Sequence, residues 1–148
     1  MKLILTIMLI FLACDNKVDE TPEEHAEISG FKIKRNDIVY VHQAANTTLL
    51  KDSLVIVNNS ATTQFKIELL DDKNQVFEPD EAGLTLKFLD LDTLLVKFEN
   101  KSGYHDGKNH FEFNLNPLKK ATNTTVFFQI LHNDHPDFTS LKFQLKVN

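Results

Sequence analysis

The 148-residue sequence contains one cysteine, no tryptophan, four glycines and four prolines. A single cysteine excludes a disulfide bond within the chain, so a folded domain must be stabilised by its apolar core. So few glycines leave no glycine-rich loop that could cradle a phosphate group. Basic residues are also scarce, with 16 Lys and Arg against 21 Asp and Glu. This balance excludes the basic face that nucleic-acid binding requires.

Long apolar runs are absent except at the start of the chain. Residues 3–12 form an apolar segment that follows Met1-Lys2 and ends at Ala13-Cys14. A basic start, a short apolar segment and a small residue before a cleavage point are the parts of a secretory signal peptide. The segment is too short to cross a bilayer as a helix, which needs about 20 apolar residues.

The end of this segment indicates the type of signal. Phe11-Leu12-Ala13-Cys14 resembles a bacterial lipobox, in which a lipoprotein signal peptidase cuts before a cysteine whose thiol carries a diacylglycerol. Phe11 departs from the pattern, which prefers Leu, Val or Ile at that position. The resemblance implies that residues 1–13 are a lipoprotein signal peptide and that the lipidated Cys14 anchors the mature chain to a membrane. The alternative is an ordinary signal peptide followed by an unrelated cysteine.

Residues 14–27 are predicted to form the lipidated cysteine and an acidic linker. The segment contains Pro22 and several acidic residues, and it has no apolar periodicity, a composition typical of a solvated linker. Acidic residues directly after the lipidated cysteine also resemble the surface-export signals of Bacteroidota lipoproteins, and the alternative is a generic linker. The predicted location is the cell envelope, lipid-anchored at the outer membrane and facing either the periplasm or the surface.

Residues 28–148 carry the alternation of apolar and polar side chains that predicts β-strands. The alternating segments lie at residues 31–34, 65–69, 84–88, 94–99, 111–115, 126–130 and 141–147. Two apolar runs, at 38–41 and 54–57, are typical of strands buried on both faces. No segment shows a sustained helical stripe. The predicted fold class is therefore all-β, an antiparallel sandwich in which twelve phenylalanines supply most of the core.

The second half of the chain resembles a known family. Residues 111–117, Phe-Glu-Phe-Asn-Leu-Asn-Pro, look like the F-x-V-x-F-x-P strand of HYDIN/ASPM/SPD-2-type immunoglobulin-like domains, also called choice-of-anchor D domains. Residues 53–60, 125–131 and 132–143 are similar to other strands and turns of that family. Ser60 stands where the family usually has Gly, and His135 is inserted before Pro136. The resemblance implies an immunoglobulin-like β-sandwich at 28–148 that binds or scaffolds and has no catalytic residues.

Histidines are the side chains most able to carry chemistry. His105 and His110 fall in one glycine-containing loop, and His132 and His135 flank an Asn-Asp turn in the final predicted hairpin. Imidazoles and carboxylates are common ligands of zinc and copper, so these four histidines are the candidate metal ligands. The alternative is that the Asn-Asp pair forms the turn while the histidines are solvated.

No pattern of side chains predicts an enzyme. The acidic pairs Asp71-Asp72 and Asp80-Glu81 fall in polar, turn-like stretches, where solvated loops are expected rather than a cleft that would shift a carboxyl pKa. The predicted function is a non-catalytic envelope lipoprotein, without a cofactor, that binds another envelope protein or an extracellular polymer. The alternative function is a metal-binding envelope lipoprotein that uses the loop histidines to hold zinc or copper.

Overall fold

The computed structural model describes residues 27–45, 48–56, 62–119 and 121–148. The signal peptide at 1–13, Cys14 and the linker at 14–27, apart from Glu27, lie outside these ranges, and their predicted roles stay predictions. The described residues contain twelve strands and no helix, so the all-β fold class is confirmed. Since no helix occurs in them, none offers the length and apolar character of a membrane span.

The strands follow the predicted alternation closely, and their bounds are as follows. They are β1 Gly30–Arg35, β2 Ile38–Ala44, β3 Thr48–Ile56, β4 Thr63–Leu70, β5 Val76–Phe77, β6 Leu84–Leu89, β7 Val96–Asn100, β8 Gly103–His105, β9 Lys108–Pro117, β10 Ala121–His132, β11 His135–Thr139 and β12 Phe143–Val147. The short strands β5, β8 and β11 were not predicted as separate elements, because two to five residues show no measurable period.

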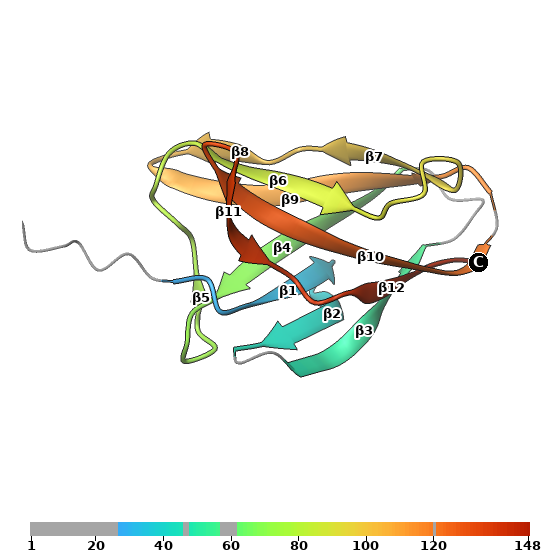
Figure 1. Cartoon of the computed structure of the whole chain (residues 1–148), viewed down its shortest axis with the longest axis horizontal. Coiled ribbons are helices and arrows are strands. Elements are labelled where there is room, and N and C mark those ends of the chain that lie inside the picture. Colours follow the sequence, from blue (N-terminus) through green and yellow to red (C-terminus); the bar gives the residue numbers. More distant parts are fainter. Residues whose placement is uncertain (1–26, 46–47, 57–61, 120) are drawn as a thin grey trace, which may run out of the picture.

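The strands form one continuous sheet that curves around the core until it is nearly a barrel (Figure 1). The order is β11-β10-β12-β3-β2-β1-β4-β9-β7. Strand β6 lies off this path and pairs with β10. All pairs are antiparallel except β12 and β3, which run parallel from Gln144 opposite Ser53 to Val147 opposite Ile56. The expectation of a purely antiparallel arrangement is wrong at this pair. Only a short connection forces neighbouring strands to be antiparallel, and these two are far apart in the chain.

Strand β10 joins two parts of the sheet. Its first half pairs with β12, and its second half pairs with β11 on one side and β6 on the other. Ser140 lies between β11 and β12 and forms hydrogen bonds to β10 as a strand residue would. Its backbone N–H donates to the Phe128 carbonyl at 2.9 Å. Its Oγ accepts from the Phe128 N–H at 3.0 Å. The buried side chain of Gln43 accepts from the Leu141 N–H at 2.7 Å. These buried polar groups therefore satisfy the backbone where the chain bends.

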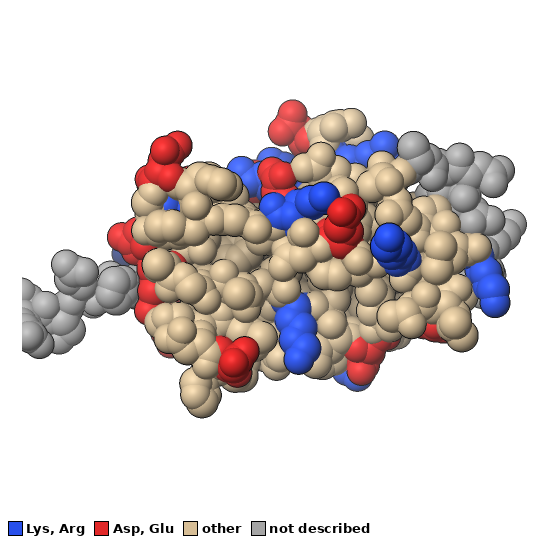
Figure 2. All heavy atoms as spheres, turned by 90° about the horizontal axis from the view of Figure 1, so that it is seen from above, with Lys and Arg blue, Asp and Glu red and all other residues tan. Residues whose placement is uncertain are grey.

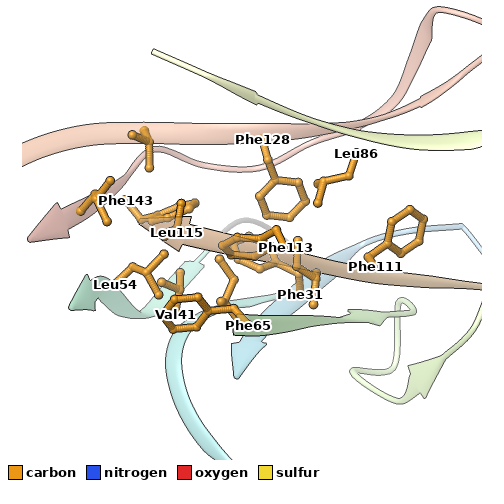
Figure 3. Packing of buried hydrophobic residues seen from close by; sticks show 14 of the residues in the cluster. Phe31, Val41, Leu54, Phe65, Leu86, Phe111, Phe113, Leu115, Phe128 and Phe143 are labelled. Atoms are coloured by element: carbon orange, nitrogen blue, oxygen red, sulfur yellow. The ribbon is translucent and has the colours of Figure 1, made fainter. Parts of the chain in front are cut away.

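The core is built on phenylalanines whose inward direction was predicted from the alternation. Phe113 and Phe128 are fully buried, and Figure 3 shows Phe128 pointing from β10 toward Phe113 on β9. The Phe31 and Phe128 rings meet edge to face with centroids 4.7 Å apart, and Phe65 stacks on Phe113 at 5.4 Å. Such offset and edge contacts are the favourable geometries for aromatic rings. The core therefore links strands from both sides of the curved sheet.

Two apolar side chains that were expected to be buried are exposed. Ile38 is 59% exposed, because it begins β2 directly after the hairpin turn at Asn36 and Asp37. Leu94 is 68% exposed, because β7 begins only at Val96 and Leu94 belongs to the preceding turn. By contrast, the predicted turn at residues 133–134 is confirmed, since both residues have positive φ angles of 48° and 67°.

The connections gather at two opposite ends of the domain (Figure 1). The N-terminal end contains Glu27, the β5–β6 loop at 78–83, the β8–β9 turn at 106–107 and the β10–β11 turn at 133–134. The C-terminal end contains the β6–β7 segment at 90–95, Leu118 and the last residue, Asn148.

Candidate functional site

His105 and His110 lie together on the β8–β9 hairpin. Their rings are nearly parallel, with centroids 6.5 Å apart. The Nδ1 atom of His110 is 3.5 Å from a carboxylate oxygen of Glu78. Lys66 and Lys108 contact the same carboxylate at 3.9 and 3.8 Å. Because two ammonium groups already neutralise Glu78, this hairpin is an unfavourable place for a metal cation.

His132 lies in a different environment at the end of β10. Its Nδ1 atom is 3.0 Å from Glu81 Oε1 and 4.0 Å from Asp137 Oδ2. In the part of the chain that the structure describes, Glu81, His132 and Asp137 are the one group of at least three metal-ligating side chains with ligand atoms within 4.8 Å of one another. We call this group the His132 cluster. His135 is paired with His132 across the hairpin, but neither it nor the β8–β9 histidines belong to the cluster.

A β-bulge brings Asp137 to the cluster. Ile130 pairs with Phe138 and Leu131 pairs with Pro136, so Asp137 is an extra residue on β11. A bulge bends its strand and redirects a side chain, which here places the Asp137 carboxylate beside the His132 ring. The sequence offers one weak signal of this bulge, since Pro136 cannot donate a ladder hydrogen bond and favours irregular edge strands.

Asn109 fixes the loop that carries Glu81. Asn109 is only 4% exposed, and its side-chain amide donates to the carbonyls of Glu81 at 2.6 Å and Pro79 at 3.0 Å. Its backbone N–H also donates to the Pro79 carbonyl at 2.8 Å. The Tyr104 hydroxyl donates to the intervening Asp80 carbonyl at 3.0 Å. Three consecutive residues of the loop are thus held by β8 and β9. The sequence analysis missed Asn109 and assigned the Asp80-Glu81 pair to a solvated loop.

The N-terminal end around the cluster is acidic. Figure 2 shows acidic side chains gathered there, at the left of the view, while Lys and acidic residues are interspersed along the rest of that face. The acidic residues of this end include Asp80, Glu81, Asp106 and Asp134 on loops and turns, and Asp137 on β11. This distribution lowers the local potential and favours the approach of cations.

His42 is a third histidine environment that the sequence analysis did not single out. It lies on β2 between Lys32 of β1 and Lys51 of β3. Burial lowers the pKa of His42 below its ordinary value, and the charges of the two lysines lower the pKa further. Its Nε2 atom is buried and has no hydrogen-bond partner among the described residues. Folding therefore disfavours protonation of His42 on the outer face of the sheet.

An apolar groove occupies the C-terminal end. It has a volume of about 640 Å³ and is lined by Phe88, Asp90, Leu91, Thr93, Val96, Lys97, Phe98 and Leu118. We call it the seam groove, because it lies where the curved sheet fails to close. Within the described ranges β6 pairs with β10 alone and β7 pairs with β9 alone, so their other edges carry no partner strand. Asn100 forms one contact across this seam, donating to the Leu86 carbonyl at 3.2 Å.

An exposed leucine, Leu118, lines the seam groove and is 54% exposed. Leu94, which is 68% exposed, directly follows Thr93 of the groove lining. The Leu118 N–H donates to the Leu95 carbonyl at 2.7 Å, which ties the two segments together. The groove was not predicted, although its residues Phe88, Val96 and Phe98 were expected to point inward. The sequence shows that these residues are apolar, but it does not indicate that β6 and β7 each have one edge without a partner strand in the described ranges.

Comparison with known proteins leaves the family open. No family model and no curated protein matches the sequence. Among solved structures, domains 5–6 of the S-layer protein SbsC are similar with a TM-score of 0.40 and 14% identity, over 84% of this chain and 54% of that chain. Domains 6–7 of SbsC in a monoclinic form have a TM-score of 0.40 and 14% identity, over 82% and 47%. The chain spans about half the length of these solved chains, and similarity at this level carries no functional argument.

Proposed function

We propose that this protein is a non-catalytic lipoprotein of the cell envelope, anchored by a lipid on Cys14, that binds another envelope protein through the seam groove. Residues 28–148 would then be an immunoglobulin-like β-sandwich that serves as the binding module. The strands β1, β4, β9 and β7 are consecutive neighbours in the sheet order, and β6, β10 and β12 form a separate run of neighbours, which supports this assignment.

The observation that carries the proposal is the seam groove with its two edge strands. Its volume of about 640 Å³ lies within the range of about 300–1,000 Å³ that is usual for ligand sites. An extended peptide can pair with an exposed sheet edge while its alternate side chains fill apolar pockets. The edges of β6 and β7 present main-chain groups on either side of an apolar floor, so the occupant that fits is an extended segment with apolar side chains.

The position of the groove agrees with lipid anchoring. The start of the described chain before β1 and the β6–β7 segment, which supplies residues of the groove lining, lie at opposite ends of the domain (Figure 1). Lipid on Cys14 and a linker of about 13 residues, which extends to about 45 Å at most, would hold the N-terminal end toward the membrane. The groove would then face away from the lipid surface, where a partner protein has access.

Site-specific crosslinking tests the proposed groove. A photo-reactive side chain is placed at Leu118 in the full-length protein, in the cells that produce it, and at the exposed Val76 of the N-terminal end as a matched control. We expect a partner protein crosslinked from Leu118 alone, through an extended apolar segment, and lost with Thr93→Asp, which places a charge on the groove lining. Equal crosslinking from both positions, or recovery of a polysaccharide instead of a protein, would overturn the proposal.

Lipidation requires a separate test. Metabolic labelling with a fatty acid and mass spectrometry of the mature N-terminus should show an acylated Cys14 and loss of residues 1–13. Cys14→Ala should abolish both labelling and membrane association. A chain that stays in the membrane fraction without label would show that the signal is not a lipobox.

A second candidate function is metal binding, and one observation favours it. The His132 ring lies beside two carboxylates from two different segments. His105, His110 and His135 have no such pair of carboxylates in the described structure. A metal-binding function would therefore depend on His132 together with acidic residues, rather than on the four histidines as a set.

A further inference from the structure

The His132 cluster has the spacing of a metal site. In a tetrahedral zinc site with bonds of about 2.0–2.1 Å, neighbouring ligand atoms are about 3.3–3.5 Å apart. The two distances from His132 Nδ1, 3.0 Å to Glu81 and 4.0 Å to Asp137, lie on either side of that value. All three ligand atoms lie within 4.8 Å of one another. Binding of one ion would require the three side chains to rotate until these separations match.

The ligand types select the class of metal. One imidazole nitrogen and two carboxylate oxygens suit zinc, which takes nitrogen and oxygen ligands in tetrahedral sites and accepts water in the fourth position. Calcium requires six to eight oxygen ligands, and magnesium favours oxygen ligands in an octahedron. The cluster therefore discriminates against both of these more abundant cations.

The ligands are held by rigid parts of the fold. His132 pairs with Leu84 at the start of β6 and with His135 of β11. The bulge in β11 places Asp137, and Asn109 fixes the loop of Glu81 through its 2.6 Å hydrogen bond. These supporting contacts limit the entropy lost when the three ligands meet an ion. The local charge also favours a cation, since Lys66 and Lys108 contact Glu78 rather than the ligands.

We propose that Glu81, His132 and Asp137 form a zinc-binding site, with His132 ligating through Nδ1. This inference rests on the second proposed function and names its ligands. The side chains are 29% exposed for His132, 40% for Glu81 and 41% for Asp137, so the ion reaches the site directly from solvent. Such exposure leaves the fourth position open to water or to a group from a partner.

Calorimetric titration of the full-length protein in detergent micelles, with zinc chloride after chelator treatment, tests the site. We expect one zinc per chain and no binding of calcium or magnesium. Glu81→Gln, His132→Gln and Asp137→Asn should each lower the affinity at least tenfold. The double variant His105→Gln with His110→Gln is the matched control and should bind zinc as the unchanged protein does.

A second measurement identifies the ligating atom. In ¹⁵N spectra of the zinc-loaded protein, the Nδ1 resonance of His132 should shift while its Nε2 keeps a proton. Melting curves without zinc should show that the three single variants are folded. Zinc binding that survives those variants but is lost in the His105 and His110 variant would overturn the site and leave the metal-binding function standing. Absence of zinc binding in every variant and in the unchanged protein would overturn both.

Discussion

The two ends of the domain are held by different kinds of hydrogen bond. At the N-terminal end, the 78–83 loop depends on Asn109, a buried residue 28 positions away from Glu81 along the chain. At the C-terminal end, Asp92 organises a turn within the 90–95 segment. Its side chain accepts from the Leu94 N–H at 2.8 Å, and its carbonyl accepts from Leu95 at 3.0 Å. The first end brings distant polar side chains together, whereas the second forms a local turn that leaves Leu94 in solvent.

This difference explains why the two ends carry different candidate sites. Long-range contacts place Glu81 beside His132 in an acidic setting, and their geometry suits a cation. The local turn adds no strand between β6 and β7, so an apolar groove stays open. One core thus supports a polar site and an apolar site at opposite ends. Substitutions at one end at a time therefore test each site separately.

The largest expected effect comes from the core that both ends share. Phe128→Ala should destabilise the domain by about 3–5 kcal/mol, because it removes a fully buried ring and leaves a cavity. Phe127 is the matched control: it is half-buried, and its ring faces the Lys142 ammonium at 5.3 Å. Its replacement by Ala should cost far less. Urea unfolding measures both variants, and equal losses would show that the assignment of inward positions on β10 is wrong.

The next largest loss of stability is expected to differ between the two ends of the domain. Asn109→Ala removes the side-chain donor of the Glu81 carbonyl and one of the two donors of the Pro79 carbonyl, and it should cost about 1–3 kcal/mol. Asn100→Ala removes a hydrogen bond across the seam to the Leu86 carbonyl and the acceptor of the Ser102 N–H, both at an exposed residue, and it should cost less than Asn109→Ala. Urea unfolding of the two variants gives the comparison directly. A larger loss for Asn100 would mean that the seam, rather than the 78–83 loop, depends on its asparagine.

A smaller loss of stability is expected on acidification, and it comes from His42 on β2 rather than from either end of the domain. Because the pKa of His42 is lowered in the folded state, the unfolded chain binds the proton more readily. The contribution of His42 is therefore present above the ordinary histidine pKa of about 6.5 and is lost as the pH falls through the folded value. Stability measured by urea unfolding at pH 7.5 and 5.5 should fall, and His42→Gln should reduce that fall. An unchanged difference in the variant would assign the pH dependence to other groups.

The smallest effect on stability is expected at the seam groove. Leu94→Ser and Leu118→Ser change exposed side chains and should alter the free energy of unfolding by no more than about 0.5 kcal/mol each. Leu118→Ser should instead weaken crosslinking to a partner from a photo-reactive side chain placed at Lys97, which also lines the groove. A stability loss above about 1 kcal/mol, measured by thermal melting, would indicate that these leucines belong to the core.

Most of the strands could be predicted from residue patterns. The alternations around Phe31, Phe65, Phe113 and Phe128 gave inward positions that the structure confirms, because a period of two puts every second side chain on one face. The turn at Asn133-Asp134 was equally readable, since Asn and Asp tolerate positive φ angles. The same patterns misplaced Leu94, because an apolar residue two positions before the start of a strand continues the alternation of that strand.

The candidate sites were only partly predictable. The sequence singled out His132 but grouped it with three histidines that lie outside the His132 cluster. It assigned Glu81 to a solvated loop, because no residue near position 81 in the sequence indicates that the buried Asn109 holds this loop. The side chains around the seam groove were recognised as apolar. The groove itself exists because β6 and β7 do not pair with each other in the described ranges, which the sequence did not indicate.

The sequence by itself determined the all-β class, the phenylalanine core and the main turns, because these follow from the periodicity and backbone preferences of neighbouring residues. Only the tertiary structure decided the parallel pairing of β3 with β12, the bulge at Asp137, the meeting of Glu81 with His132, and the open seam between β6 and β7. Each of these depends on which distant strands become neighbours. That choice is made by the packing of the whole core, and no local pattern of residues encodes it.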